Sequence, residues 1–376
     1  MTFTYLNLSY FLVGAVCGVI LSFAAKPKSK SAKKSHDDFL KYIQSINYII
    51  DNETDRAIDE LTNLVKLNPE LIEIYLAIGN LFRIRGELNR ALIVHKSLLA
   101  KPHIDRKLKR EIILAIGIDY DKAGFHQKAA DNFKQLVQMD RSDKDAASFL
   151  KEAYEKNHEW TKALDVLKNF DLKRKNEESH ILVAIGKERR SNGDNQSAKS
   201  FFKKAIKTDS DCFEAYYELA RSEYEEGNKE NAFNIIKKAV EKNHRFVSVV
   251  SDLIVEMLEG NYLEFYKSML SKFPKSPELL FDFLYHLSKN DQLVLAENII
   301  KSADFSGEGE KLLLEYWRCR LDMEKNLIGS KAIRQFLDKV NEKPKFRCEY
   351  CGFVQKEIFW KCPQCRKWDT SEVIFG

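Results

Sequence analysis

The chain has 376 residues, of which 44% are hydrophobic and 31% are charged, and its formal net charge is +5. This length exceeds one ordinary compact domain, and the scarcity of glycine (15) and proline (7) argues against a sheet-rich fold and for long helices with short turns. Five lysines between residues 26 and 34 equal the whole net charge. The rest of the chain is therefore nearly neutral, which argues against a basic body that wraps nucleic acid.

The N-terminal segment is predicted to be a membrane anchor. Residues 3–25 carry no charged side chain, and a helix of about 20 apolar residues spans the hydrocarbon core of a bilayer. No Lys or Arg precedes Lys26, so the positive-inside rule places the N-terminus outside and the rest of the chain in the cytoplasm. We expect residues 1–25 to be a single-pass anchor and residues 26–35 to be a basic juxtamembrane linker.

A cleaved signal peptide is the alternative for this segment. Phe23-Ala24-Ala25 resembles a small-residue cleavage site. A signal peptide, however, carries its positive charge before the apolar run, and here the lysines follow it. The order of charge and apolar residues therefore favours a retained anchor.

A repeat with a period near 34 residues runs through the middle of the chain. Its most regular members are alanines at positions 57, 91, 129, 163, 198 and 232. Small residues precede most of these alanines by 12 positions, namely Ser45, Gly79, Gly117, Gly186 and Ala220. Glycines precede them by five positions at Gly86, Gly124, Gly193 and Gly227. The period is that of tetratricopeptide helix–turn–helix units.

We therefore expect an all-α fold in which residues 36–343 form a tetratricopeptide-type α-solenoid. Six units are regular, and Phe246–Pro274, Pro277–Ala303 and Lys311–Val340 are expected to be degenerate helical pairs. The small residues suit the points where paired helices cross most closely, and each glycine suits a left-handed helix end. Such arrays present a concave surface that binds protein segments, so a scaffold or adaptor is expected.

Four cysteines in residues 344–376 are predicted to bind one metal ion. They form two Cys-x-x-Cys pairs, made by Cys348, Cys351, Cys362 and Cys365. Two such turns complete a tetrahedron of thiolates, and no His or carboxylate nearby suggests an open position. The pattern favours a closed structural site over a catalytic one and zinc over iron, although a rubredoxin-like iron site has the same ligands. Two disulfides are the competing interpretation. The remaining cysteines, Cys17, Cys212 and Cys319, lie far apart in the sequence and are expected to be free thiols.

No sequence feature predicts an enzyme. The eight histidines form no pair at metal-ligand spacing, and neither a phosphate-binding loop nor a Gly-x-Ser-x-Gly elbow occurs. Trp360 and Trp368 are expected to dock the metal module on the last repeats, because so short a segment builds little core of its own. Two other functions stay open: rubredoxin-like electron transfer, and nucleic-acid binding through a basic set of ribbon residues. That set is Lys356, Lys361, Arg366 and Lys367.

The order of anchor, repeats and metal knuckle resembles the lipopolysaccharide assembly protein B family (LapB) of Gram-negative bacteria. The resemblance is carried by Cys348-x-x-Cys351-Gly352, by Trp360-x-Cys362-Pro363-x-Cys365-x-x-Trp368 and by residues 78–91 of the second repeat. It implies a cytoplasmic adaptor on the bacterial inner membrane, with a periplasmic N-terminus, and the four cysteines as metal ligands.

The same resemblance implies the partners. They are the deacetylase LpxC, the membrane protease FtsH that degrades it, and other lipopolysaccharide assembly factors. It also leaves homo-oligomerisation open. The anchor has its own sequence and the last repeats are degenerate, so the family's contacts within the membrane and the groove do not transfer residue by residue.

Overall fold

A computed structural model of the chain describes residues 30–51, 53–67, 71–102, 104–172, 174–290, 292–302, 317 and 345–374. The predicted anchor, the start of the linker and most of the pair Lys311–Val340 lie outside these residues. Among the described helices, none is both long enough and apolar enough to cross a bilayer. The chain divides into two compact units, Met1–Asn157 and His158–Gly376.

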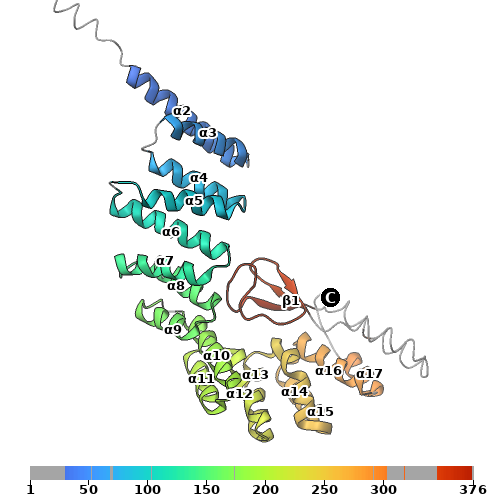
Figure 1. The fold of residues 1–376 in the computed structure, drawn as a ribbon. Helices are drawn as coiled ribbons and strands as arrows, with labels where there is room; N and C mark the ends of the chain where they lie inside the picture. Colours follow the sequence, from blue (N-terminus) through green and yellow to red (C-terminus); the bar gives the residue numbers. More distant parts are fainter. Residues whose placement is uncertain are drawn as a thin grey trace, which may run out of the picture. The chain divides into compact units, whose positions relative to one another are not determined.

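The first unit is a stack of helical hairpins, seen in blue to green in Figure 1. Its helices are α2 (Lys30–Ile50), α3 (Thr54–Leu67), α4 (Ile72–Ile84), α5 (Leu88–Leu99), α6 (Arg106–Lys122), α7 (His126–Met139) and α8 (Lys144–Lys156). Each helix contacts the next one along the chain, and the contacts are densest between α6 and α7, α4 and α5, α7 and α8, and α2 and α3. Helix α2 begins at Lys30, so the part of the expected linker from that residue onward is helical.

The second unit continues with helical hairpins and ends in a small sheet. Its helices are α9 (Trp160–Asn169), α10 (Lys175–Ser191), α11 (Asn195–Thr208), α12 (Phe213–Glu225), α13 (Lys229–Lys242), α14 (Val247–Leu258), α15 (Tyr262–Lys272), α16 (Pro277–Lys289) and α17 (Leu293–Ser302). Two 3-10 turns, η1 (His244–Phe246) and η2 (Glu259–Asn261), flank α14. The degenerate pairs expected from Phe246 and from Pro277 are thus present as α14–α15 and α16–α17.

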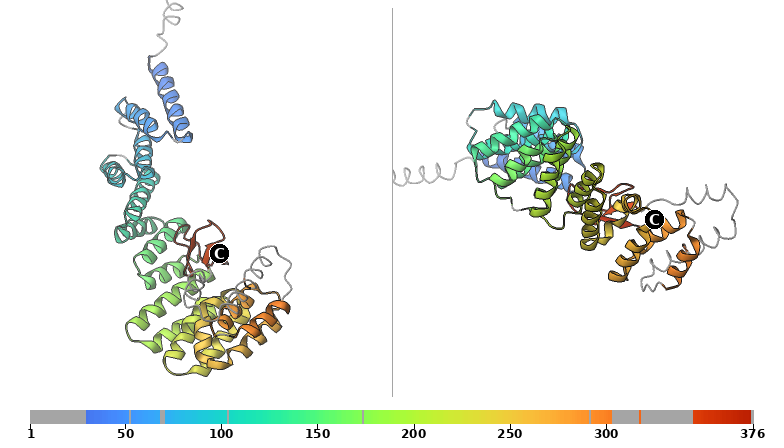
Figure 2. Two further views of the ribbon diagram at one scale, coloured as in Figure 1. Left: turned by 90° about the vertical axis from the view of Figure 1, so that its right-hand side faces the viewer. Right: turned by 90° about the horizontal axis from the view of Figure 1, so that it is seen from below.

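The C-terminal segment, residues 345–374, is called the ribbon below. Its strands are β1 (Lys345–Cys348), β2 (Val354–Gln355) and β3 (Ser371–Ile374), in the antiparallel order β2-β1-β3. Figure 2 shows this sheet, in red, from two further directions. The helical solenoid is confirmed. The all-α expectation did not include this sheet, whose strands are too short to show an alternating sequence pattern.

Glycines in the first helix of a unit act as sockets for large side chains in the second. A Cβ on Gly117 would lie 2.4 Å from the Phe133 ring, and one on Gly186 would lie 2.4 Å from the Phe202 ring. Both rings come four residues after the repeat alanines, which are themselves fully buried. The predicted close crossing is therefore present, but the group that the glycine accommodates is an aromatic ring one turn beyond the alanine.

The inter-helix glycines end their helices in the left-handed conformation, as predicted. Gly86, Gly124, Gly193 and Gly227 have φ between +79° and +87°. Only glycine adopts this region without steric cost. The residue five positions before Ala163 is His158, which adopts φ 57° without being a glycine.

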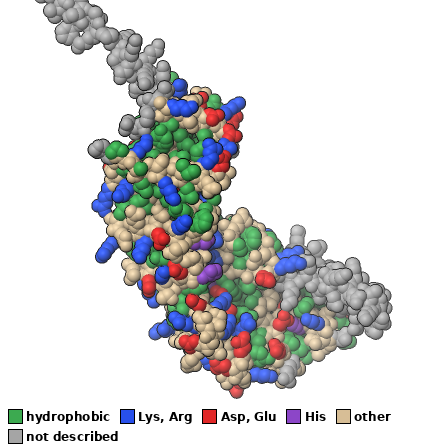
Figure 3. All heavy atoms as spheres, in the orientation of Figure 1, with side chains coloured by type: hydrophobic (Ala, Val, Ile, Leu, Met, Phe, Trp, Pro, Cys, Tyr) green, Lys and Arg blue, Asp and Glu red, His purple; other side chains and the backbone are tan. Residues whose placement is uncertain are grey.

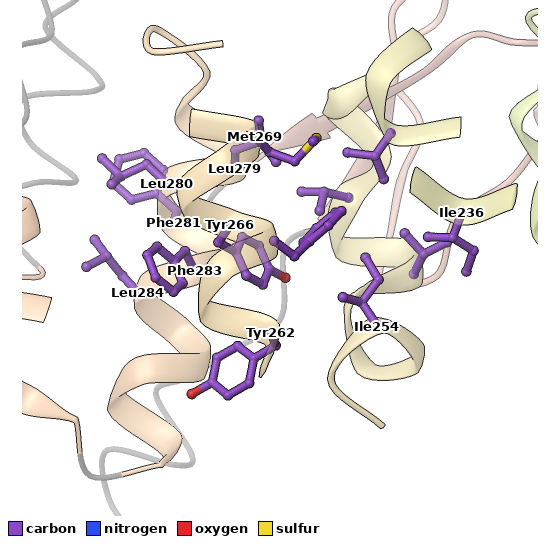
Figure 4. Packing of buried hydrophobic residues seen from close by; sticks show 14 of the residues in the cluster. Ile236, Ile254, Tyr262, Tyr266, Met269, Leu279, Leu280, Phe281, Phe283 and Leu284 are labelled. Atoms are coloured by element: carbon purple, nitrogen blue, oxygen red, sulfur yellow. The ribbon is translucent and has the colours of Figure 1, made fainter. Parts of the chain in front are cut away.

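The degenerate repeats keep a continuous core although their sequence pattern weakens. Tyr266 and Phe283 are stacked, with ring centroids 4.9 Å apart and planes 6° apart (Figure 4). The Tyr266 hydroxyl donates to the Asp282 carboxylate, and burial together with that carboxylate raises the pKa of Tyr266 well above its usual range. Stacked aromatic rings are therefore part of the core of these repeats. Figure 3 shows basic and acidic side chains interspersed on the visible face, in agreement with a nearly neutral body.

Candidate metal centre and its contact with the repeats

The four predicted cysteine ligands meet at one point of the ribbon. The Sγ atoms of Cys348, Cys351, Cys362 and Cys365 all lie within 4.8 Å of one another. Sγ of Cys348 is 3.6 Å from Sγ of Cys365, and Sγ of Cys351 is 3.6 Å from Sγ of Cys362. A tetrahedral ion with metal–sulfur bonds of about 2.3 Å needs sulfur–sulfur distances of about 3.8 Å, whereas a disulfide needs about 2.05 Å. The thiols therefore form a tetrathiolate metal site, and the arrangement does not determine which metal it holds.

Local backbone geometry presents the sulfurs in two equivalent turns. In the first turn the Gly352 amide donates to the Cys348 carbonyl at 2.8 Å, and Gly352 has φ 76°. In the second turn the Arg366 amide donates to the Cys362 carbonyl at 3.0 Å, and Arg366 has φ 63°. A left-handed residue thus follows each pair, and in the second turn it is an arginine, for which this conformation is costly.

Electrostatics within the thiol cluster call for a cation. Burial opposes ionisation of Cys348, but the Thr370 hydroxyl and the backbone amides of Cys351 and Tyr350 lower the pKa of its thiol to about 6. The Lys367 amide favours ionisation of Cys365, yet burial and the three neighbouring cysteines raise its pKa to about 12. Four sulfurs this close do not all ionise together unless a metal ion neutralises them.

The ribbon packs on the repeats of its own unit, and two of its tryptophans take part in this contact. Trp368 lies parallel to the His180 ring, with centroids 4.7 Å apart and planes 11° apart. Trp360 lies 6.1 Å from Phe213 and 5.5 Å from Phe246, centroid to centroid. Both tryptophans dock on repeats as expected, and among the described residues their ring partners lie on α10, α12 and η1.

A charged cluster lies beside this aromatic contact. His180, whose side chain is 1% exposed, is bound through Nε2 to Oδ1 of Asp369 at 2.6 Å and through Nδ1 to Oε2 of Glu214 at 2.7 Å. Lys187 bridges Glu214 and Glu218 on α12. Arg190 completes the cluster with a 2.6 Å ion pair to Glu218. We call this set, His180, Lys187, Arg190, Glu214, Glu218 and Asp369, the His180 cluster.

Carboxylates decide the charge of the buried imidazole. Burial by itself would lower the pKa of His180, but hydrogen bonds with Asp369, Cys212 and Glu214 raise it well above its usual range. The pKa of Lys187 is also raised, because Glu214 and Glu218 outweigh its partial burial. Three basic side chains therefore face three carboxylates, and Asp369 is the ribbon's contribution to that balance.

Sequence reasoning missed this cluster. The spacing of the histidines predicted no metal-ligand pair and assigned no role to His180, and Asp369 was not singled out. A signal did exist on the repeat side: His180 and Glu214 each lie six residues before the small residue of their unit, so they occupy equivalent positions on neighbouring first helices. The ribbon side had no comparable signal, because Asp369 is 189 residues from His180.

The other singled-out residues have local roles where the structure describes them. Nζ of Lys361 lies 5.1 Å from the Trp368 ring centroid, and Nζ of Lys367 lies over the Tyr350 ring. Two of the four basic residues considered for nucleic-acid binding thus contact the ribbon's own aromatic rings. Cys212 is buried, with its sulfur 4.0 Å from Nδ1 of His180.

Two protein-family models match parts of this chain. Residues 346–371 match a family described as a rubredoxin metal binding domain, and residues 183–244 match the tetratricopeptide repeat family. The crystal structure of MamA is 24% identical, covers 44% of this chain and 95% of its own, and gives a TM-score of 0.33.

Two relatives are similar over most of the chain. Lipopolysaccharide assembly protein B of Escherichia coli (strain K12) is 26% identical over 356 residues, which cover 89% of either protein. The protein of the same name from Haemophilus influenzae is 25% identical over 380 residues, which cover 92% of this chain and 93% of the relative. The expected resemblance to lipopolysaccharide assembly protein B is therefore confirmed over about 90% of the chain.

Proposed function

We propose that this chain is a non-catalytic adaptor of lipopolysaccharide assembly that binds another protein along its helical repeats. The proposal is supported by the similarity to lipopolysaccharide assembly protein B over about 90% of the chain. The observation that carries it is the seating of the ribbon on α10 and α12 through Trp360, Trp368 and the His180 cluster. A metal module built into the wall of a repeat array is suited to shaping a binding surface.

The metal is proposed to be zinc, with Cys348, Cys351, Cys362 and Cys365 as its ligands. Four thiolates leave no open coordination position, so a bound ion would cross-link the two turns of the ribbon without activating water or substrate. Iron in the same site would suit the electron-transfer alternative. Metal analysis together with a visible absorption spectrum of the purified chain separates the two ions, since zinc is colourless and ferric thiolate is not.

The chain is further proposed to be held at the bacterial inner membrane by residues 1–25, with the N-terminus in the periplasm and the repeats in the cytoplasm. This part rests on the apolar run and on the lysines that follow it. Confinement to the membrane surface raises the effective concentration of the array near membrane-bound partners.

The client is proposed to be LpxC, presented to FtsH. This finer assignment comes from the family resemblance. The test is to deplete the chain in its own bacterium and to follow the amount and half-life of LpxC. We expect LpxC to accumulate on depletion and to return to normal when the wild-type gene is restored. Crosslinking at the membrane should recover LpxC, FtsH or both with this chain.

A matched pair of variants tests whether this function requires the metal site of the ribbon. In cells depleted of the natural chain, a variant with Cys362 and Cys365 replaced by Ser should leave LpxC elevated, whereas Glu372→Gln, which alters only an ion pair with Arg347 within the ribbon, should restore turnover. Unchanged LpxC on depletion would contradict the assignment of client. Strong salt-dependent binding of RNA or DNA by the purified chain would favour the nucleic-acid alternative instead.

A further inference from the structure

The second metal turn is the tip of a small hairpin whose base contacts the repeats. Residues 360–369, called the knuckle hairpin, are closed by hydrogen bonds from the Asp369 amide to the Trp360 carbonyl and from the Cys362 amide to the Lys367 carbonyl, both 2.8 Å long. Lys361 and Trp368 form a β-bridge between these bonds. The tip therefore carries two of the four metal ligands.

The base of the knuckle hairpin carries every ribbon group in the His180 contact. Asp369 bonds Nε2 of His180, Trp368 stacks on the imidazole, and Trp360 packs against Phe213. Asp369 adopts φ 53°, a conformation that a non-glycine residue keeps only when its surroundings hold it. The hydrogen bond to His180 stabilises this conformation of Asp369 from outside the ribbon.

We infer that His180 on α10 is a positioning residue for the metal centre: by fixing Asp369 and Trp368 at the base of the knuckle hairpin, it slows the loss of a metal ion that it does not touch. The inference rests on the proposed metal binding and is independent of the adaptor function. It follows from rigidity, because two ligands and the docking groups belong to the same ten-residue hairpin.

Thermodynamic linkage makes this coupling work in both directions. If docking on His180 favours the metal-bound geometry of the hairpin, then metal binding must favour docking by the same factor. Outer partners of metal ligands commonly change metal affinity by about 10–100-fold. His180 lies one step further from the ion, so we expect an effect of about tenfold at the lower end of that range.

The first test compares two acidic residues of the ribbon. Asp369→Asn removes the charge that faces His180, and Asn tolerates the left-handed backbone at least as well as Asp. The control is Glu372→Gln, because Glu372 pairs with Arg347 inside the ribbon at 2.9 Å and its side chain is 37% exposed against 42% for Asp369. The readout is the rate at which the purified full-length chain, loaded with zinc in detergent, transfers the ion to a coloured chelator.

We expect Asp369→Asn to release zinc about tenfold faster than the wild type and Glu372→Gln to stay within about twofold. Equal rates for Asp369→Asn and the wild type would overturn the inference. So would an equal acceleration by Glu372→Gln, since that would mean a general weakening of the ribbon. A wild-type chain that takes up neither zinc nor iron would overturn the inference together with the metal proposal, and would leave the adaptor proposal standing.

A double-mutant cycle asks whether His180 and Asp369 act as one contact. The double variant should release zinc no faster than His180→Gln alone, because that change already removes the contact with Asp369. Multiplied effects in the double variant would contradict direct coupling. Circular dichroism of the helices identifies any His180 variant that fails to fold, and the exposed Asp369 variant then decides the question by itself.

The effect of the metal on the repeats can be tested without measuring zinc release. Removing the metal with a chelator should increase amide hydrogen exchange in α10 around His180. Helix α6 of the other unit serves as the internal reference, because it contains no residue of the His180 cluster. Unchanged exchange in α10 after complete metal removal would contradict the linkage.

Discussion

Two buried histidines, one in each unit, show how the same side chain can serve different ends. In the first unit, Nδ1 of His95 lies 2.5 Å from Asp119, and Arg83 bonds the same carboxylate at 3.0 Å. In the second unit, His180 also faces carboxylates, but one of them comes from the ribbon. Both imidazoles are almost completely buried. The first histidine holds neighbouring repeats together, whereas the second joins an array to a separate module.

The difference lies in the sequence distance that each contact spans. Asp119 is 24 residues from His95, and the Gly79 socket that receives the His95 ring belongs to the adjacent helix of the same hairpin. A solenoid supplies contacts of this range by its repetition. The contact of His180 with Asp369 spans 189 residues and depends on where the ribbon docks. Breaking each contact should therefore affect different properties.

The largest effect is expected at Asp119. Asp119→Ala leaves the buried side chain of His95 and the partly buried Arg83 without their shared carboxylate. Loss of one partner of a buried ion pair typically costs about 3–5 kcal/mol. Chemical denaturation followed by circular dichroism should show that loss, while zinc release from the ribbon stays at the wild-type rate. Faster zinc release in this variant would mean that the two histidine contacts are not separate in the way proposed.

A socket substitution in α10 comes next. Gly186→Ala would place a Cβ 2.4 Å from the Phe202 ring, and overpacking of this kind costs about 1–3 kcal/mol. Gly260→Ala is the matched control, because nothing lies within 4 Å of its added Cβ and its φ is not positive. In thermal denaturation, the control should have a melting temperature close to that of the wild type. Equal melting temperatures for the two variants would contradict the socket interpretation.

A pH-dependent effect is expected at His180. Because Asp369, Cys212 and Glu214 raise its pKa against the effect of burial, the stabilisation is fully present below the unfolded pKa of about 6.5 and is lost as the pH rises through the higher folded value. At pH 6 we expect the wild type to exceed His180→Gln in unfolding free energy by about 1–2 kcal/mol. Denaturant titrations at a series of pH values should show this difference shrinking as the pH rises. A difference that grows with pH would mean that folding lowers the pKa of His180 instead of raising it.

The smallest effect is expected from an exposed ion pair. Arg221 and Glu225 form an i,i+4 pair on α12 in which both side chains are 49% exposed. Such pairs contribute about 0.3–0.5 kcal/mol and are screened by salt. Arg221→Ala should therefore change the unfolding free energy by less than about 0.5 kcal/mol. A loss comparable to that of Asp119→Ala would show that burial is not what separates these contacts.

Much of the fold followed from local patterns. The small residues and alanines of the repeats predicted the helical hairpins, and Gly86 and Gly193 predicted left-handed helix ends that the structure contains. What the pattern did not reveal was the content of the sockets. The groups four residues after the alanines differ, with His95 where two other units have Phe133 and Phe202. Their partners depend on packing between helices, which a repeat period does not encode.

The amino-acid sequence by itself determined the helical period and the grouping of four thiols. Both depend on spacings of a few residues up to one repeat, over which chain geometry leaves few choices. Only the tertiary structure decided that the ribbon seats on α10 and α12, that Asp369 reaches His180, and that the imidazole is buried among carboxylates. Those contacts join residues far apart in the chain. Their selection depends on shape and charge complementarity between folded surfaces, which exist only after the local elements have formed.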